Sequence, residues 1–318
     1  MPLLLNEKDI VECLPLDEHT LNIAERAFAA LRDPATVSPH RKLLATTERD
    51  AQLEVRAAQV AGFKWIVVRC TSHWNKKRQS EAQAGSVTQL YNTDDGTLDG
   101  LLLGRGHLRA IRGAVCSAIA TRYLAKDPVH CLGILGTGQQ LKLQIQANLL
   151  VRDIRQVLIW GRDFAKAKRL AEKLSAEFGI EIKAEADSSL IAQQADLMIS
   201  ITAAESPIMS GHTLKSGLHI TAMGADTPEK QEFDASVYAA IDRIWVDRVS
   251  LAEKAGELHH MRQSGYWMET PPELGQVING KRTGRKDDTE ITFCDLTGLA
   301  AIDTALANLI MDNAIAKG

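Results

Sequence analysis

The pattern of hydrophobic and polar positions divides the chain into two regions. In the first region, the apolar residues of 17–31 recur at helical spacing, with Asp17 as the predicted N-cap. Short extended runs follow at 63–70, 86–91 and 101–103. The turn-rich sequence at 92–96 separates the last two runs and predicts a hairpin in a mostly antiparallel sheet. A helix of small residues is expected at 114–124.

Strands and helices alternate in the second region. The predicted strands are 131–135, 157–160, 180–183, 197–202, 219–223 and 243–246. The predicted helices are 141–150, 164–178, 188–194 and one that begins at 249. This alternation indicates a parallel sheet wrapped by helices, in which ligands lie at the carboxyl ends of the strands. The polar segment 275–290 is expected to be a surface connection, and 298–317 a final helix that can return to the first sheet.

A glycine turn stands at the centre of the second region. The apolar run 131–135 ends in Gly136-Thr137-Gly138-Gln139-Gln140 and then opens into a helix. Gly136 permits a sharp bend, and Gly138 allows the backbone to approach an anion without a Cβ in the way. The free N–H groups of the new helix favour a dinucleotide pyrophosphate. Leu141 takes the place of the usual third glycine, so an ordinary strand-closing turn is the alternative.

Composition narrows the function classes. The chain has 318 residues, 45% hydrophobic and 24% charged, with a formal net charge of -3. That charge argues against a nucleic-acid partner, and the sequence shows no apolar run of membrane-spanning length, so we expect a cytoplasmic protein with no membrane partner. The five cysteines are scattered without CxxC spacing and predict buried thiols, with neither disulfides nor a metal site. The basic stretch at 73–78 is interpreted as a solvated loop that can overhang a pocket.

Several motifs occur in a fixed order along the chain. They are Gly62-Phe63-Lys64, Arg112-Gly113-Ala114-Val115-Cys116-Ser117-Ala118, Gly136-Thr137-Gly138-Gln139-Gln140, Ser200-Ile201-Thr202, Ala222-Met223-Gly224-Ala225-Asp226, Gly256-Glu257-Leu258, Glu273-Leu274-Gly275 and Gly284-Arg285. In this order and spacing the chain resembles the ornithine cyclodeaminase/mu-crystallin family over nearly its whole length.

The resemblance implies a fold class and an assembly. It implies an α/β protein with a Rossmann-type NAD(P)-binding domain at 126–298. An α+β domain for substrate binding and dimerisation would comprise 1–125 and be completed by the helix 299–318. The resemblance also implies a homodimer, NAD or NADP as cofactor, and an amino or imino acid as substrate.

Four residues match the family's substrate site. Lys64 matches a catalytic lysine, with a snorkelling surface lysine as the alternative. Asp226 would exchange a proton with the substrate nitrogen, although an Asp before Thr-Pro can also cap a turn. Arg112 and Arg41 match arginines that hold the substrate carboxylate, for which a guanidinium fork is well suited. The family counterpart of Arg112 also lies near the cofactor phosphates, and Arg41 has a solvated basic run as its alternative.

The cofactor's ribose is expected at the end of the second strand of the alternating region. Gly161 and Arg162 follow that strand, and an arginine there favours the 2′-phosphate of NADP. Asp163 weakens this preference because its charge can repel a phosphate, unless it caps the next helix. The other expected cofactor contacts, from loops that the family shares, are Thr202, Met223, Gly224 and Thr297.

Three functions remain open from the sequence. The first is an oxidoreductase that moves a hydride between the nicotinamide and the α-carbon of an amino acid or cyclic imino acid, as in amino-acid dehydrogenases and ketimine reductases. The second is a cyclodeaminase-type lyase that uses NAD catalytically and releases ammonia. The third is a dinucleotide-binding protein without turnover.

Overall fold

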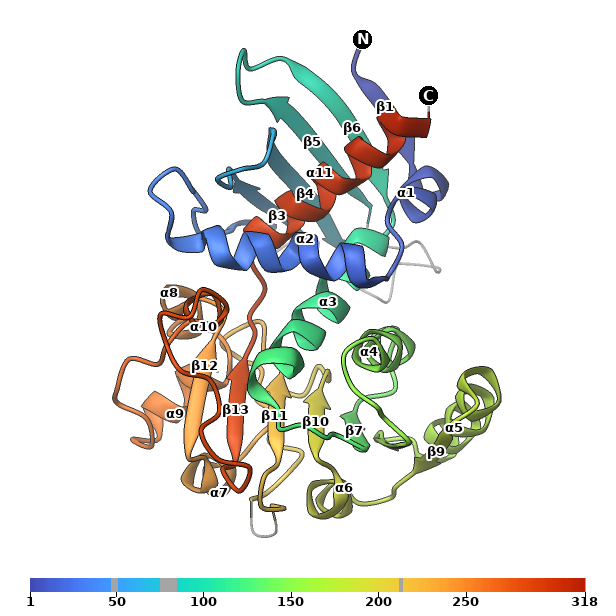
Figure 1. The fold of residues 1–318 in the computed structure, drawn as a ribbon, viewed down its shortest axis with the longest axis vertical. Coiled ribbons are helices and arrows are strands. Elements are labelled where there is room, and N and C mark those ends of the chain that lie inside the picture. Colours follow the sequence, from blue (N-terminus) through green and yellow to red (C-terminus); the bar gives the residue numbers. More distant parts are fainter. Residues whose placement is uncertain (47–50, 75–84, 212–213, 318) are drawn as a thin grey trace. The chain divides into compact units, whose positions relative to one another are not determined.

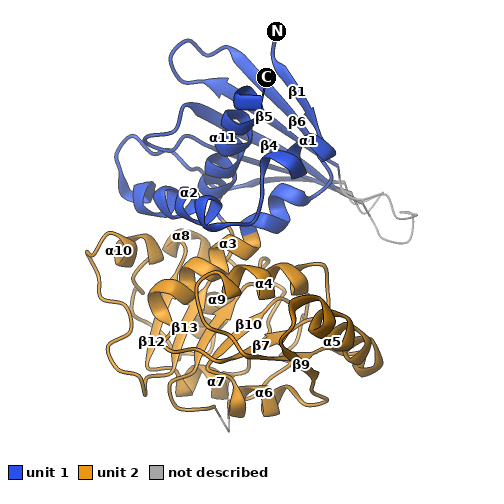
Figure 2. Ribbon diagram, turned by 45° about the vertical axis from the view of Figure 1, so that its right-hand side comes forward, with its two compact units in different colours: residues 1–112, 299–318 blue, residues 113–298 orange. Residues whose placement is uncertain are grey.

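The chain forms two compact units in a computed structural model that describes residues 1–46, 51–74, 85–211 and 214–317. Unit 1 comprises Met1–Arg112 and Leu299–Gly318, and unit 2 comprises Gly113–Gly298 (Figure 2). The first boundary falls inside the helix α3 (His107–Leu124), whereas the sequence placed it after that helix, at 125/126. Most of the basic stretch 73–78 lies outside the described residues.

Unit 1 is built on a six-stranded sheet with the order β1-β6-β5-β4-β3-β2 (Figure 1). Its strands are β1 (Leu3–Asn6), β2 (Lys42–Thr46), β3 (Ala51–Ala58), β4 (Trp65–Trp74), β5 (Ser86–Asn92) and β6 (Leu98–Gly104). Neighbouring strands are antiparallel except for β1 and β6, which run parallel. The predicted hairpin is confirmed, because β5 and β6 pair across the 92–96 turn.

Helices cover one face of this sheet. They are α1 (Glu7–Cys13), α2 (Glu18–Ala29) with a 3-10 turn at Ala30–Arg32, and α11 (Ala300–Lys317). The predicted N-cap of α2 is confirmed, since the Asp17 carboxylate accepts a hydrogen bond from Thr20 N at 2.8 Å. The predicted final helix is also confirmed, and it packs on β3, β4 and β5 (Figure 1). Asn308 on α11 bonds to both the N–H and the carbonyl of Trp65, at 3.0 and 3.2 Å.

The two faces of the sheet differ because side chains alternate along each strand. Trp65, Val67 and Arg69 of β4 point to the inner face, where α11 lies, and are buried. The outer face carries apolar side chains, and none of the described helices of unit 1 packs on it. Leu4 and Leu44 on this face are each 61% exposed, and Val87 and Leu103 are also exposed.

Unit 2 is built on a seven-stranded sheet with the order β12-β13-β11-β10-β7-β8-β9. Its strands are β7 (Cys131–Leu135), β8 (Gln156–Trp160), β9 (Glu181–Ala184), β10 (Leu197–Ser200), β11 (His219–Ala222), β12 (Arg243–Val246) and β13 (Thr292–Asp295). All neighbouring pairs are parallel, so the predicted parallel sheet is confirmed. The sequence missed β13, which lies between β11 and β12.

Helices connect these strands. They are α4 (Gln140–Leu149), α5 (Phe164–Phe178), α6 (Ser188–Gln194), α7 (Ala235–Ala240), α8 (Val249–Ala252), α9 (Glu257–Gln263) and α10 (Leu274–Ile278). The short helix α10 begins the segment that was expected to be only a surface connection. α3 is longer than predicted and begins two turns earlier, at His107. Unit 2 is therefore a Rossmann-type α/β unit and unit 1 an α+β unit, as the fold class predicted.

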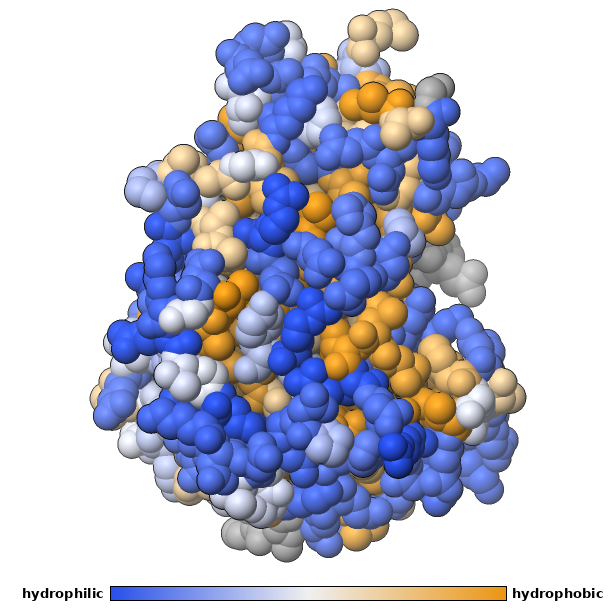
Figure 3. Space-filling view, viewed as in Figure 1, coloured by the Kyte–Doolittle hydropathy of each residue, from blue (hydrophilic) through white to orange (hydrophobic). Residues whose placement is uncertain are grey.

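Apolar side chains are collected inside the units. In unit 2, one cluster includes Leu132, Ile134 and Val157, and a second includes Ile220, Phe233 and Phe293. Hydrophilic residues dominate the surface that Figure 3 shows, with smaller apolar groups between them. The five cysteines are free thiols, and all but Cys70 are buried. Within the described residues, no helix has both the length and the apolar character that a membrane span requires.

Candidate active site

The candidate site of unit 2 lies where the strand order reverses. β7 pairs with β8 on one side and with β10 on the other, so the connections after β7 and β10 leave the sheet in opposite directions. Ligands of parallel sheets bind outside the carboxyl ends of the strands at such a point. The glycine turn 136–140 follows β7 directly, and the loops after β8, β10, β11 and β13 leave the same edge of the sheet.

The glycine turn has the backbone that the sequence predicted. Gly136 has a φ of +131°, and a Cβ there would lie 2.9 Å from Ile201 Cγ1 and 3.2 Å from the Ile201 carbonyl oxygen. Gly138 has no atom within 4 Å of its missing Cβ, so the space in front of it is open. At Gly161 a Cβ would lie 2.6 Å from Thr137 Cγ2. Gly136 therefore permits the bend, Gly138 leaves open space in front of the turn, and Gly161 allows close packing against Thr137.

The first turn of α4 continues this surface. Gln139 is exposed and precedes the helix without a side-chain cap, and the Leu141 N–H of the first turn donates to the Gly138 carbonyl at 3.2 Å. Gln140 accepts a hydrogen bond from Gln144 Nε2 at 3.2 Å, and the same amide nitrogen lies 3.8 Å from Met223 Sδ. This link ties the glycine turn to the loop after β11.

A buried glutamate holds the loops after β10 and β11 together. Glu232 Oε1 accepts hydrogen bonds from Ser200 Oγ at 2.5 Å and from both Thr202 N and Oγ1 at 2.7 Å. Its Oε2 accepts from Gly224 N at 2.9 Å. A Cβ at Gly224 would lie 2.2 Å from the Thr202 carbonyl oxygen, so glycine is required for this approach. Burial raises the pKa of Glu232, although its four hydrogen bonds oppose that shift.

Further buried carboxyl groups support the same edge. Glu257 accepts hydrogen bonds from Glu232 N at 2.8 Å and from the Tyr238 hydroxyl at 2.5 Å, and burial raises its pKa to about 8. At the end of β12, Asp247 accepts from Thr297 Oγ1 at 3.0 Å and from Gly298 N at 2.7 Å. Burial raises the pKa of Asp247 to about 6. Thr297 is thus fixed in place by a carboxyl group that the sequence analysis did not identify.

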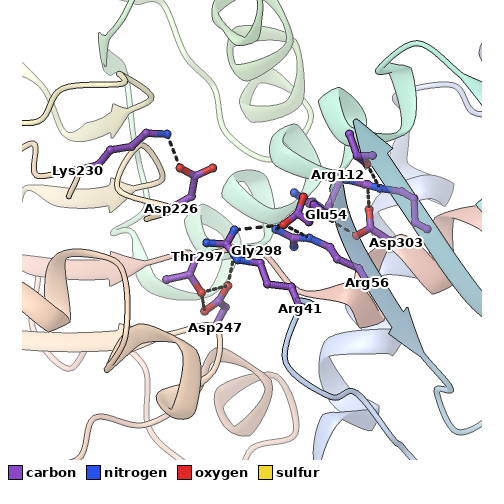
Figure 4. A network of polar contacts seen from close by, with 12 residues as sticks. Arg41, Glu54, Arg56, Arg112, Asp226, Lys230, Asp247, Thr297, Gly298 and Asp303 are labelled. Carbon is purple, nitrogen blue, oxygen red and sulfur yellow. Dashed lines mark hydrogen bonds and ion pairs between the residues drawn. The ribbon is translucent and has the colours of Figure 1, made fainter. Parts of the chain in front are cut away.

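Asp226 lies in the loop after β11. Its N–H donates to the Gly224 carbonyl at 3.0 Å, and its Oδ1 is 2.5 Å from Lys230 Nζ (Figure 4). The Asp226 side chain is 24% exposed, so it is accessible and also paired with a cation. The carboxylate therefore contacts a side chain four residues later in the same loop.

The end of β8 places Arg162 and Asp163 in different roles. Arg162 is exposed. Asp163 is the N-cap of α5, and its side chain accepts a hydrogen bond from Lys166 N at 2.9 Å. The capping alternative for Asp163 is therefore the one that the structure shows.

Unit 1 contains a second polar centre, on the inner face of its sheet. Two carboxylates each bind two arginines there: Glu54 Oε1 lies 3.3 Å from Arg41 Nη1 and 2.8 Å from Arg56 Nη2. Asp303 Oδ1 lies 2.5 Å from Arg69 Nη1, and Asp303 Oδ2 lies 2.7 Å from Arg112 Nη1. Figure 4 shows five of these residues pointing toward one another. We name the whole set the arginine cluster: Arg41, Glu54, Arg56, Arg69, Arg112 and Asp303.

Lys64 is not part of the arginine cluster. It is exposed, and its ammonium lies 4.7 Å from the centre of the Trp65 ring. Burial raises the pKa of Asp312 on α11, and the charge of Lys64 opposes this shift. Asp312 lies nine residues beyond Asp303, which corresponds to about 13 Å along the helix. Lys64 directly precedes β4, whereas Arg69 is the charged side chain that β4 directs inward. The structure thus brings Arg41 and Arg112 into one centre and leaves Lys64 outside it.

Several polar residues of these centres were missed in the sequence analysis. They are Glu54, Arg56, Arg69, Glu232, Asp247 and Asp303. A signal existed for the first three, because charged residues at inward positions of apolar strands require a partner. No local signal identified Asp303 as the partner of Arg69, since 234 positions separate them.

The comparisons with known proteins agree with this architecture. The family model described as "Ornithine cyclodeaminase/mu-crystallin family" matches residues 2–318. An uncharacterized cyclodeaminase of Sinorhizobium fredii is 32% identical over 315 residues, which cover 98% of this chain and 95% of that protein. The iminosuccinate reductase of Paracoccus denitrificans is 32% identical over 253 residues, covering 79% and 78%.

Solved structures share the whole fold. The iminosuccinate reductase of Paracoccus denitrificans in complex with NAD+ superposes with a TM-score of 0.92 at 29% identity, covering 100% of this chain and 97% of that one. An archaeal alanine dehydrogenase dimer with bound NAD gives a TM-score of 0.91 at 24% identity, covering 99% and 97%. With the family model matched from residue 2 to residue 318, this chain belongs to the ornithine cyclodeaminase/mu-crystallin family.

Proposed function

We propose that this protein is an NAD(P)-dependent oxidoreductase that acts on the CH–NH or C=N bond of an amino or imino acid. The observation that carries the proposal is the glycine turn at the strand-order reversal, with open space at Gly138 and polar loops at the same edge. The relationship to an iminosuccinate reductase solved with NAD+ supports the same reaction class.

The residues at this edge fit a nicotinamide dinucleotide. The turn 136–140 and the N-terminus of α4 would bind the pyrophosphate, and Gly161 and Arg162 would meet the ribose. Thr202, Met223, Gly224 and Thr297 would line the nicotinamide side. Because Asp163 is occupied as a helix cap, Arg162 remains the charged group that favours the 2′-phosphate of NADP.

Asp226 would handle the proton in the reaction. A nicotinamide cofactor, when bound, would provide the hydride chemistry at the α-carbon. In the reductive direction Asp226 would deliver a proton to the substrate nitrogen, and in the oxidative direction it would accept one. Its pairing with Lys230 holds the carboxylate in one orientation. Arg41 and Arg112 would bind the α-carboxylate through their guanidinium forks. Lys64, which directly precedes β4 and is exposed, stays the proposed catalytic lysine.

A matched pair of variants tests the proton route. We expect Asp226→Asn to lower turnover at least about 100-fold, the usual contribution of a positioned acid or base. The dissociation constant of NADH, followed by fluorescence titration, should stay unchanged. The control Asp187→Asn neutralises an exposed N-cap of α6, a position where Asn also caps, and should keep full turnover. Wild-type turnover in Asp226→Asn would remove the proton role, and failure of the wild-type protein to bind NADH or NADPH would refute the oxidoreductase.

A cyclodeaminase is the second candidate, because the Sinorhizobium fredii relative is described as one. Ornithine would then yield ammonia without a net change in nicotinamide absorbance. A dehydrogenase or reductase would change that absorbance in proportion to product.

We further propose that the protein is a homodimer joined through the outer face of the unit 1 sheet. This face presents the exposed side chains of Leu4, Leu44, Val87 and Leu103, and burial of such an apolar surface favours association. The related alanine dehydrogenase was solved as a dimer. Light scattering should report twice the chain mass, and Leu103→Glu should reduce it to one chain. A monomeric wild-type protein at micromolar concentration would refute this assembly.

A further inference from the structure

The carboxylate of Glu232 accepts hydrogen bonds from two different loops of unit 2. Thr202, in the loop after β10, donates both its N–H and its hydroxyl to Oε1 at 2.7 Å. Ser200, the last residue of β10, donates its hydroxyl to the same oxygen at 2.5 Å. In the loop after β11, the Gly224 N–H donates to Oε2 at 2.9 Å. One side chain therefore joins the two loops, and it uses a different oxygen for the backbone of each.

This arrangement requires a carboxylate. The two backbone donors, Thr202 N and Gly224 N, reach different oxygens, so both oxygens must act as acceptors. A glutamine has nearly the same shape but only one acceptor oxygen, and its NH2 group would face one of the two N–H groups. Glu232 is fully buried, so a donor that loses its acceptor there has the full desolvation penalty.

The main chain at Glu232 is held in place as well. Gln231 N donates to the Ala204 carbonyl at 3.0 Å, and Ile208 N donates to the Glu232 carbonyl at 2.9 Å, so this segment lies along the loop after β10. The Glu232 N–H donates to the Glu257 carboxylate at 2.8 Å. Because its backbone is fixed by these bonds, the Glu232 side chain forms a rigid link between the two loops.

The two loops also approach each other closely at Gly224. A Cβ there would lie 2.2 Å from the Thr202 carbonyl oxygen and 2.4 Å from the Glu232 carboxyl carbon. Thr202 and Met223, one on each loop, are nevertheless only partly buried. The buried link therefore fixes the spacing of residues that a ligand can reach.

We propose that Glu232 is a positioning residue for the nicotinamide half of the cofactor. It holds Thr202 and Gly224 at a fixed spacing before the cofactor binds, and it acts through these two residues. Such preorganisation raises affinity, because less ordering of the loops has to accompany binding. The inference rests on the proposed oxidoreductase function, in which Thr202, Met223 and Gly224 line the nicotinamide side.

Two ligands separate positioning from general stability. NADH contains both halves of the cofactor, whereas ADP contains only the adenosine and the two phosphates that the glycine turn would bind. Glu232→Gln should raise the dissociation constant of NADH about tenfold, the effect of one lost buried hydrogen bond, and should change that of ADP by less than about twofold. Fluorescence titration measures NADH binding, and calorimetry measures ADP binding.

Two further variants are matched controls. Glu205→Gln makes the same substitution at an exposed glutamate in the loop after β10, and both dissociation constants should stay at their wild-type values. Ser200→Ala removes one donor from the Glu232 carboxylate but keeps both backbone N–H bonds, so NADH affinity should fall by less than about threefold. A loss in Ser200→Ala as large as that in Glu232→Gln would overturn the role of the two backbone bonds. Thermal unfolding verifies that each variant is folded.

Hydrogen–deuterium exchange of single amides, without any cofactor, tests the link directly. The amides of Thr202 and Gly224 should exchange at least about tenfold faster in Glu232→Gln than in the wild-type protein, and Glu205→Gln should match wild type. The wild-type measurement alone remains decisive if Glu232→Gln does not fold. Protection of both amides would then support the preformed spacing, and unprotected amides would overturn it.

The outcomes also separate this inference from the proposed function. Equal NADH affinity of wild type and Glu232→Gln would overturn the inference and keep the oxidoreductase. An equal loss of NADH and ADP affinity would overturn it too, because Glu232 would then support the whole unit. A selective loss of NADH affinity, in a protein that oxidises no amino acid and reduces no imino acid, would keep the positioning role and refute the oxidoreductase.

Discussion

Replacing Asp303 by Asn should strongly destabilise unit 1. Asp303 is 1% exposed and accepts hydrogen bonds from Arg69 at 2.5 Å and Arg112 at 2.7 Å. Asn keeps one acceptor oxygen but removes the charge, so two buried guanidinium groups lose their shared counter-ion. Breaking a buried pair by removing one partner costs about 3–5 kcal/mol. For a unit of this size such a loss lowers Tm by about 10–20 °C.

The pH dependence gives this prediction a second, independent measurement. Burial opposes ionisation of Asp303, but the neighbouring arginines outweigh it and hold its pKa below the usual value. A carboxyl group with a lowered folded-state pKa contributes stability above its unfolded pKa and loses it as the pH falls through the folded value. The difference in Tm between wild type and Asp303→Asn should therefore be largest at pH 7 and should decrease below about pH 4.

Urea and thermal unfolding at pH 7 provide the assay, with Asp312→Asn as the control. Asp312 lies on the same helix and is exposed, so its replacement should change stability by less than about 1 kcal/mol. Equal losses in the two variants would show that the arginines do not depend on Asp303. A difference that stayed constant down to pH 3 would contradict the charge-based explanation.

Three further predictions concern unit 2. Gly133→Ala should lower the free energy of unfolding in urea by about 1–3 kcal/mol, because its Cβ would lie 2.2 Å from Ile191 Cγ2. Gly138→Ala should unfold like wild type and weaken NADH binding on the order of tenfold. Equal unfolding of the two variants would refute the packing argument. Burial raises the pKa of Glu257 to about 8, so the protein should lose stability as the pH rises from about 4.5 to 8. Glu257→Gln should flatten the slope of Tm against pH, measured from pH 5 to 9. An unchanged slope would mean that another group titrates. Arg162→Ala should raise the dissociation constant of NADPH more than that of NADH, and an equal change would exclude a 2′-phosphate contact.

The fold was predictable wherever periodicity and burial coincide. The apolar run of β7 and the amphipathic pattern of α5 both gave elements close to those observed. β13 was missed because Thr292–Asp295 mixes polar and apolar residues, although all four are buried. Its polar groups are satisfied by partners distant in sequence, such as Arg285 with Thr292, and a local pattern does not contain that information.

The candidate site was predictable only in part, for a similar reason. Gly136 and Gly138 were identified because their special roles depend on local backbone and appear as a short motif. The arginine cluster depends on strand register and on a helix from the other end of the chain, so only its family-matched members, Arg41 and Arg112, were found. Trp65 is buried on the inner face of β4, and Arg69, four residues later, lies on the same face. The charged residues of these strands gave a sequence signal, but their partner Asp303 did not, and Lys64 stays a prediction from the family match.

The last helix has a consequence for how the protein is made. Unit 2 is a continuous segment, 113–298, inserted into unit 1, whose final piece is α11. On the ribosome, the Rossmann unit can fold while the first sheet still lacks the helix that covers it and the carboxylate that Arg69 needs. Unit 1 is therefore completed only after α11 has been synthesised, and nascent chains that stop short of residue 300 should be preferred substrates for chaperones and proteases.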